Sequence, residues 1–409
     1  MSDDANTQSY QLTFGTDQSI EFALPPERVV WQHYAPEAVA DPAAAVREAL
    51  SAPIDFPPLS QAVIPDDVVV IAAEVDTPGL QVIVAEVWSI LAERGVEPDH
   101  LVIVQAAGGA DPRLQLPDDV RDKVTWLQHN PDNKSALAYL ASTTGGERIQ
   151  LARAVTDADV VLTVGRIGFD PLLGFRGTNS AFYPELSTTD AIAKTRGQGH
   201  VELEPEDSRP LRQIVDEVGW LLGTQFTIQT IPALRNGIAV TLAGAFEPVL
   251  RRGKEYVSRE LLVTPDERPE LVVVAVSDDA GGHGWKQVAA AIATGRRLVA
   301  RDGKILVLSQ MNEDVAEGLQ ILKLVESPED AIKPLRLESP IDLIAATQIA
   351  SAVQWADVYL LSGVDADLVD DLFMFPLGDV DEARRLIGNV EGTVAIIEDA
   401  HNVHGRIAD

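Results

Sequence analysis

A strand–helix–strand unit near the N-terminus constrains the fold more than any other feature of the sequence. Residues Val68–Ala73 form a continuous apolar run, which is typical of a strand buried on both faces. An amphipathic helix is expected over Leu80–Arg94, stopped by Gly95, and Leu101–Gln105 is the next apolar run. Two neighbouring strands joined through a helix lie parallel in one sheet. The sequence therefore predicts an α/β fold with a mostly parallel sheet.

The same alternation restarts after a short linker. Residues 264–270 (TPDERPE) combine proline with charged side chains, which is a composition typical of linkers. A buried strand over Leu271–Val276 and a helix over Trp285–Ala300 follow. We therefore expect two α/β domains, residues 1–264 and residues 271–409, with mostly parallel sheets and a cleft between the domains that holds a ligand.

Three local patterns complete the expected first domain. Alternating apolar residues in Tyr10–Phe14 and Ile20–Leu24 predict a two-stranded hairpin. The apolar runs Phe226–Ile231 and Ile238–Leu242 flank an Asn-Gly pair and predict an antiparallel strand pair. Residues Lys134–Ala141 are expected to be helical.

Charge and composition exclude several classes of function. The 409 residues include 63 acidic and 32 basic ones, for a net charge of −31, so the surface repels nucleic acid and anionic lipid. There is no cysteine, which excludes disulfides, thiolate metal sites and cysteine nucleophiles. The sequence has no apolar run of membrane-spanning length and begins without a secretory signal. We expect a cytoplasmic protein whose partner is a small molecule, and the sequence leaves a homo-oligomer open.

The stretch Asp157–Pro184 is the first candidate for a site. The apolar run Val160–Val164 ends at Gly165 and leads into a segment rich in glycine and polar residues. Open α/β sheets bind their ligands where buried strands end in such turns. Within this segment, Arg176 could receive a carboxylate or a phosphate, or it could form a salt bridge across the loop.

Other candidates follow neighbouring strands. Glu74 and Asp76 end the first strand and could orient a hydroxyl or a cation, or cap the next helix. His283 and Trp285 lie on the glycine-rich turn SDDAGGHGW, which favours a pocket lining. The glycines match neither a dinucleotide fingerprint nor a P-loop, and a GxSxG elbow is absent. The histidines of the C-terminal tail are expected to be solvated.

The order of these segments resembles the nickel-pincer lactate racemase family over some 300 residues. The entry segment VREALSAPIDFPPL and the strands VVVIAAEVDTPG, IVQAAGGADPR, TWLQHNPDN and DGKILVLSQ stand where that family has its corresponding elements. The segment Asp157–Pro184 resembles the family's central glycine-rich segment. The resemblance implies a lactate racemase-like two-domain α/β fold and an isomerase that racemises or epimerises 2-hydroxy acids.

The resemblance also implies a cofactor. In the family, a nucleotide-derived pincer cofactor holds nickel, a lysine carries the cofactor covalently, and histidines ligate the metal or relay the proton. An arginine steadies the substrate carboxylate. The position of the cofactor lysine falls on Ser180, and the two relay histidines fall on Ala110 and Asp170. An alanine cannot relay a proton, and a serine hydroxyl has no reason to form the linkage of the lysine.

At further positions, too, residues that have a role in the family's chemistry are replaced in this sequence. The aspartate and arginine of its first motif fall on Glu74 and Thr77, and a lysine of its second domain falls on or near Ala291. His200 stands near the position of the nickel-ligating histidine. We therefore expect a diverged or catalytically silent member in which the pincer nucleotide is not covalently attached.

Two hypotheses about function follow from these replacements. In the first, an altered catalytic site uses His200 as metal ligand together with His283 and Asp170. The residues expected to contact a cofactor or ligand are Glu74, Asp76, Arg176, Ser180 and Trp285. In the second, the protein is not catalytic and uses the same cleft to bind a small ligand, such as a hydroxy acid, or a partner.

Overall fold

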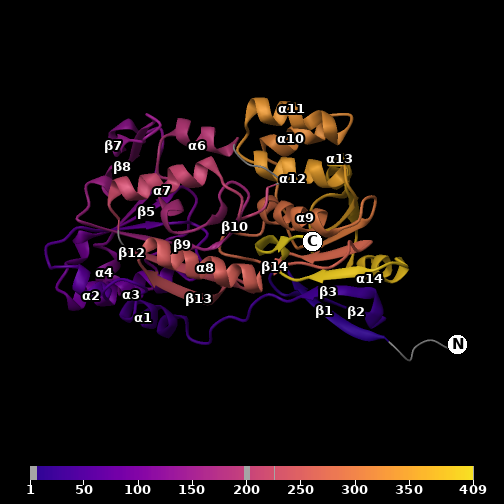
Figure 1. The fold of residues 1–409 in the computed structure, drawn as a ribbon, viewed down its shortest axis with the longest axis horizontal. Coiled ribbons are helices and arrows are strands. Elements are labelled where there is room, and N and C mark those ends of the chain that lie inside the picture. The colour runs from indigo at the N-terminus through magenta and orange to yellow at the C-terminus, as the bar shows by residue number, and fades with distance from the viewer. Residues whose placement is uncertain (1–6, 198–202, 225, 409) are drawn as a thin grey trace. The chain divides into compact units, whose positions relative to one another are not determined.

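The computed structural model describes residues 7–197, 203–224 and 226–408. These residues form two compact units, one made of residues 36–258 and the other of residues 1–35 together with 259–409 (Figure 1). Each unit is an α/β structure built on its own six-stranded sheet, which confirms the predicted fold class. Within the described residues, no helix is both long and apolar enough to cross a membrane.

The sheet of the first unit is parallel except at one edge. Its strand order is β13-β12-β9-β4-β5-β6, and only β13 runs antiparallel to its neighbour. The strands are β4 (Val69–Ala73), β5 (Leu101–Ala106), β6 (Thr125–His129), β9 (Val160–Arg166), β12 (Phe226–Ala233) and β13 (Gly237–Gly244). The antiparallel pairing of β12 and β13 confirms the strand pair predicted from the Asn-Gly turn.

Alternation along β4 explains how both faces of this sheet are covered. Ile71 packs with the apolar side of α3 (Leu80–Glu93), whereas Val70 and Ala72 belong to a second core that includes Val215 of α7 (Pro210–Leu222). Successive side chains of a strand point to opposite faces, so a run that is apolar at every position needs a helix layer on each side.

The sheet of the second unit is parallel throughout. Its order is β18-β17-β16-β15-β19-β3. The strands are β3 (Val29–His33), β15 (Leu271–Ala275), β16 (Lys304–Leu308), β17 (Asp357–Leu361), β18 (Phe375–Leu377) and β19 (Val394–Ile397). Helices α9 (Trp285–Leu298) and α12 (Leu343–Val353) lie side by side against it (Figure 1).

Residues 7–35 belong to this second unit, whereas the sequence predicted a single boundary at residue 264. The predicted hairpin forms as β1 (Gln8–Phe14) and β2 (Gln18–Leu24), and its apolar face joins the core that includes Val273. Strand β3 then pairs with β19, near the far end of the chain. Burial of the alternating apolar side chains therefore draws the N-terminus to the C-terminal sheet.

The helix expected over Lys134–Ala141 is not formed. A single turn, η3 (Lys134–Ala136), leads into β7 (Leu137–Ser142), which pairs with β8 (Arg148–Ala152). Cross-strand pairing, which local helix propensity does not reveal, decides this segment. The remaining helices are α1 (Pro42–Ser51), α2 (Leu59–Ala62), α4 (Asp118–Arg121), α5 (Arg153–Thr156), α6 (Thr189–Arg196), α8 (Phe246–Glu260), α10 (Glu317–Lys323), α11 (Pro328–Glu338), α13 (Ala366–Asp371) and α14 (Val380–Asn389). The remaining strands are β10 (Gly168–Asp170), β11 (Gly174–Arg176), β14 (Leu262–Val263) and β20 (His404–Gly405).

Candidate functional site

Each sheet has one point where the direction of strand addition reverses. In the first unit this switch point lies between β4 and β9, and in the second unit it lies between β15 and β19. Loops that leave neighbouring parallel strands at a switch point diverge to opposite faces, and the space at the carboxyl ends is where open α/β sheets bind ligands. The residues that follow β4, β9, β15 and β19 are therefore the candidates for function.

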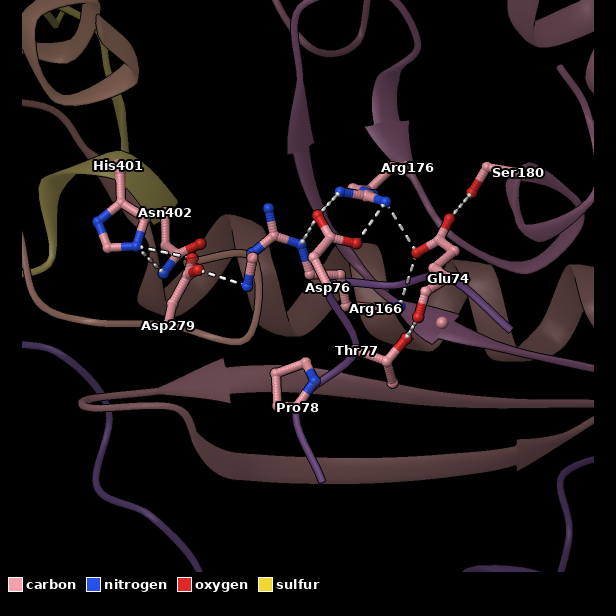
Figure 2. A network of polar contacts seen from close by, with 12 residues as sticks. Glu74, Asp76, Thr77, Pro78, Arg166, Arg176, Ser180, Asp279, His401 and Asn402 are labelled. Carbon is pink, nitrogen blue, oxygen red and sulfur yellow. Dashed lines mark hydrogen bonds and ion pairs between the residues drawn. The ribbon is translucent and has the colours of Figure 1, made fainter. Parts of the chain in front are cut away.

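Four charged residues and one serine meet at the switch point of the first unit. This switch-point cluster consists of Glu74, Asp76, Arg166, Arg176 and Ser180 (Figure 2). Arg176 binds Asp76 with two nitrogens, at 2.6 and 3.0 Å, and lies 2.9 Å from Oε2 of Glu74. Nε of Arg166 lies 3.6 Å from Oδ2 of Asp76. Two carboxylates and two guanidinium groups therefore neutralise one another.

Ser180 adds a hydrogen bond to the carboxylate of Glu74. Its hydroxyl donates to Oε1 of Glu74 at 2.7 Å and accepts from the backbone N–H of Gly177 at 2.9 Å. The backbone N–H of Arg166 donates to the other carboxylate oxygen at 3.1 Å. Thr77 turns its hydroxyl to the backbone carbonyl of Glu74, at 2.8 Å. Both oxygens of Glu74 are thus occupied, and Glu74 is not the cap of the following helix.

Burial makes the charge balance of the cluster important. The side chains of Asp76 and Glu74 are 4% and 7% exposed, and that of Arg176 is 14% exposed. Burial alone would lower the pKa of Arg176, but the charges of Asp76 and Glu74, with a further contribution from Asp170, raise it well above its ordinary value. The guanidinium therefore stays charged and fixed between the two carboxylates.

Asp170 serves the turn in which it stands. Its Oδ1 accepts the backbone N–H groups of Leu172 and Leu173, both at 2.8 Å. A carboxylate that closes its own turn in this way fixes the loop between β10 and β11 and so helps to place Arg176. Of the eight residues expected in a site, Glu74, Asp76, Arg176 and Ser180 are brought together here, with Asp170 close by. His200 lies outside the described residues.

His283 and Trp285 lie in the second unit. Nε2 of His283 accepts the backbone N–H of Gln310 at 3.0 Å, so the ring proton is on Nδ1, which faces the carbonyl oxygen of Ser277 at 3.3 Å. Ser309 also bonds Nε2, at 2.9 Å. Trp285 is 4% exposed, and its indole N–H donates to the carbonyl of Glu313. Both side chains hold the start of α9 in place.

The hydrogen bonds of His283 predict that the stability of the fold depends on pH. Burial, and to a smaller degree His401, lower its pKa from the ordinary 6.5, against the opposing effects of the Ser277 carbonyl, Asp278 and Asp279. A folded-state pKa below that of the unfolded chain stabilises the fold fully above about pH 6.5, and this stabilisation is lost as the pH falls through the folded-state value. An NMR titration of the ring, assigned with His283→Asn, should give a pKa below 6.5. A value at or above it would contradict the neutral, acceptor role of Nε2.

The switch point of the second unit holds a polar cluster that the sequence did not suggest. Nε2 of His401 lies 2.9 Å from Oδ2 of Asp279 (Figure 2). Nδ1 of the same ring lies 3.6 Å from Oδ1 of Asp399. Asp399 in turn accepts from the hydroxyl of Ser277. His401, with its side chain 2% exposed, is not part of a solvated tail as expected, because β19 carries this segment into the core. In the sequence, the signal for this cluster was the acidic residues that follow the apolar strands β15 and β19.

The first unit also contains a cluster residue that the sequence analysis missed. Arg166 directly follows Gly165 at the end of β9, and the glycine lets the carboxylate of Glu74 approach the strand closely. An added Cβ at Gly165 would come within 2.8 Å of Oε2 of Glu74. A charged residue next to a strand-ending glycine was thus the signal for Arg166.

The fold and the two switch points define an α/β protein with one candidate ligand-binding edge in each unit. Residues 14–202 match the family model described as the lactate racemase N-terminal domain. The structure of the lactate racemase apoprotein from Thermoanaerobacterium thermosaccharolyticum is similar, with a TM-score of 0.79 at 17% identity, covering 98% of this chain and 100% of that chain. A protein from Thermotoga maritima has a TM-score of 0.67 at 14% identity, covering 92% of this chain and 100% of that chain. A comparison with curated proteins found no match.

Residues 14–202 are thus similar to the lactate racemase N-terminal domain, and the fold of the chain is lactate racemase-like. The family match covers the segment that contains Glu74, Asp76, Arg176 and Ser180, and the structural likeness extends to the second unit. The resemblance inferred from the order of sequence segments is thereby confirmed.

Proposed function

We propose that this lactate racemase-like protein binds a small ligand and does not carry out nickel-pincer racemisation. The observation that carries the proposal is the hydrogen bond from Ser180 to Glu74, at the position where the resemblance places the cofactor lysine. The hydroxyl is engaged with a carboxylate inside a neutral cluster that is closed by two arginines. No residue of the cluster offers an amine for a covalent linkage.

The chemistry of the cluster does not fit the family's cofactor. The groups of the cluster that could ligate a metal are one hydroxyl and two carboxylates. Each carboxylate is paired with an arginine. Histidine, the ligand and proton relay that the resemblance calls for, is replaced by Ala110 and by Asp170, which closes a turn. A carboxylate paired with a guanidinium is a poor metal ligand, because the arginine would have to be displaced first.

The alternative hypothesis, a diverged racemase or epimerase that would be an isomerase, depends on His200 and His283. The bonding of His283 disfavours it, because one ring nitrogen is occupied by a backbone N–H and the other faces a backbone carbonyl. A proton relay needs a nitrogen within reach of the substrate. His200 remains the single histidine on which this alternative depends.

The proposal predicts that no pincer nucleotide becomes attached to the chain. The protein is produced together with the cofactor-synthesis enzymes and nickel, and its intact mass is compared with the mass calculated from the sequence. We expect the unmodified mass, since Ser180 has no amine. A lactate racemase that carries the lysine, produced in the same way, is the positive control. A stable adduct on this chain, mapped to any residue, would contradict the proposal.

A further inference from the structure

A pocket lies in the first unit and shares no lining residue with the switch-point cluster. It has a volume of about 330 Å³ and lies between the loop that precedes α7 and the helix α8. Its lining combines the apolar residues Leu173, Phe175 and Pro205 with the cationic residues Arg209, Arg212 and Lys254. Three cations in the lining of one pocket stand out in a chain with a net charge of −31. A pocket of this size and mixed lining is typical of small-molecule sites.

The two arginines are held by the protein itself. Arg209 donates to the backbone carbonyls of Pro171 at 3.2 Å and Glu204 at 3.0 Å, and Arg212 binds Asp216 through Nε at 3.0 Å and through a second nitrogen. These contacts fix both guanidinium groups as parts of the wall. Their charge contributes to the potential of the pocket, but their donors are largely used.

Lys254 is different. Its ammonium nitrogen lies 5.1 Å from the ring centroid of Phe175, and within the described parts of the chain it forms no ion pair with a carboxylate. Burial and the neighbouring Arg212 lower its pKa, against weaker opposing effects of Asp216 and Glu206. An ammonium group that is half-buried without an anion gains most from a ligand that supplies one.

Two acidic residues of the lining restrict the charge of that anion. Glu206 and Asp207 also line the pocket, and both are exposed. Their carboxylates penalise a dianion such as phosphate more than a monoanion, because the repulsion grows with the charge of the ligand. The apolar lining residues favour a ligand that can place carbon atoms against Phe175 and Leu173.

We propose that this pocket binds a small organic monocarboxylate, with its carboxylate on Lys254 and its apolar part against Phe175. The site shares no residue with the switch-point cluster, so the inference does not depend on the absence of racemase chemistry. A protein that carried the pincer cofactor could still bind a carboxylate here.

Calorimetric titration with benzoate tests the proposal, with benzamide as the uncharged analogue and inorganic phosphate as the dianion. We expect saturable binding of benzoate with a dissociation constant in the millimolar range or below, and roughly tenfold weaker binding of benzamide. Lys254→Met should weaken benzoate binding by roughly the same factor. Lys194→Met, which removes an exposed lysine of the same unit, should not change it.

A second measurement does not depend on any variant. Acetylation of the wild-type protein by acetic anhydride, followed by peptide mass spectrometry, should be slowed by benzoate at Lys254 and not at Lys194. Absence of saturable benzoate binding would overturn the proposal, as would equal affinities of wild type and Lys254→Met. Tighter binding of phosphate than of benzoate would overturn the ligand class, and unprotected acetylation at Lys254 would overturn the position of the carboxylate.

Discussion

Replacing Arg176 with alanine is expected to lower the free energy of unfolding of the first unit by about 3–5 kcal/mol. The substitution leaves the carboxylates of Glu74 and Asp76 buried beside one another, with 7% and 4% of their side chains exposed. The cost comes less from the lost attraction than from two negative charges that are left without their main partner. Chemical denaturation, followed with a probe in the first unit, measures the effect.

An exposed ion pair provides the control. Arg252 pairs with Glu255 on α8 at 3.3 Å, and the two side chains are 67% and 57% exposed. Arg252→Ala should change the free energy of unfolding by less than about 1 kcal/mol, because water solvates both charges. If Arg176→Ala were as mild as Arg252→Ala, the cluster would not be the closed ionic network on which the proposed absence of cofactor chemistry rests.

The second large effect is expected from Gly174→Ala. Gly174 lies in β11 with φ of +75°, a conformation that residues with a side chain rarely adopt. A Cβ there would lie 2.3 Å from the carbonyl oxygen of Pro205, which is backbone and cannot rotate away. Strain and overlap together should cost about 2–5 kcal/mol and displace the loop that carries Pro205. Denaturant unfolding measures the cost, and benzoate titration measures the damage to the pocket.

Gly168→Ala is the matched control in the same hairpin. A Cβ at Gly168 would meet no heavy atom within 4 Å, and its φ lies outside the left-handed region. The free energy of unfolding should change by less than about 1 kcal/mol, and benzoate affinity should not change. Similar effects of the two substitutions would mean that the backbone contact between Gly174 and Pro205 does not shape the pocket.

The sequence predicts those parts of the fold that depend on local pattern. The apolar run Val69–Ala73 and the amphipathic helix after it are recognisable because burial on two faces leaves a strand with no polar position. The allocation of β3 to the C-terminal sheet is not recognisable, because it rests on pairing with β19 more than 350 residues away. The strand β7 was missed for a different reason: its partner β8 is close in sequence, but pairing with that partner and not the composition of the segment determines it.

In the candidate site, too, the residues could be predicted from the sequence but their partners could not. Glu74 was predicted as a site residue because it follows a buried strand, and Ser180 because the resemblance puts the cofactor lysine at its position; the two side chains are hydrogen-bonded. The partner of Arg176 was left open between a ligand and a salt bridge, because a sequence does not show which carboxylates are near; the structure has Asp76 and Glu74 there. The pocket at Lys254 joins segments that no sequence spacing relates.

The most direct test of the central claim is an assay of lactate racemisation. The protein, produced with nickel and the cofactor-synthesis enzymes, is incubated with one enantiomer of lactate, and the other enantiomer is measured by chiral chromatography. With Ser180 bonded to Glu74 in place of the cofactor lysine, we predict no conversion above that of a sample without the protein. Interconversion of the enantiomers that is abolished by His200→Ala would contradict the account.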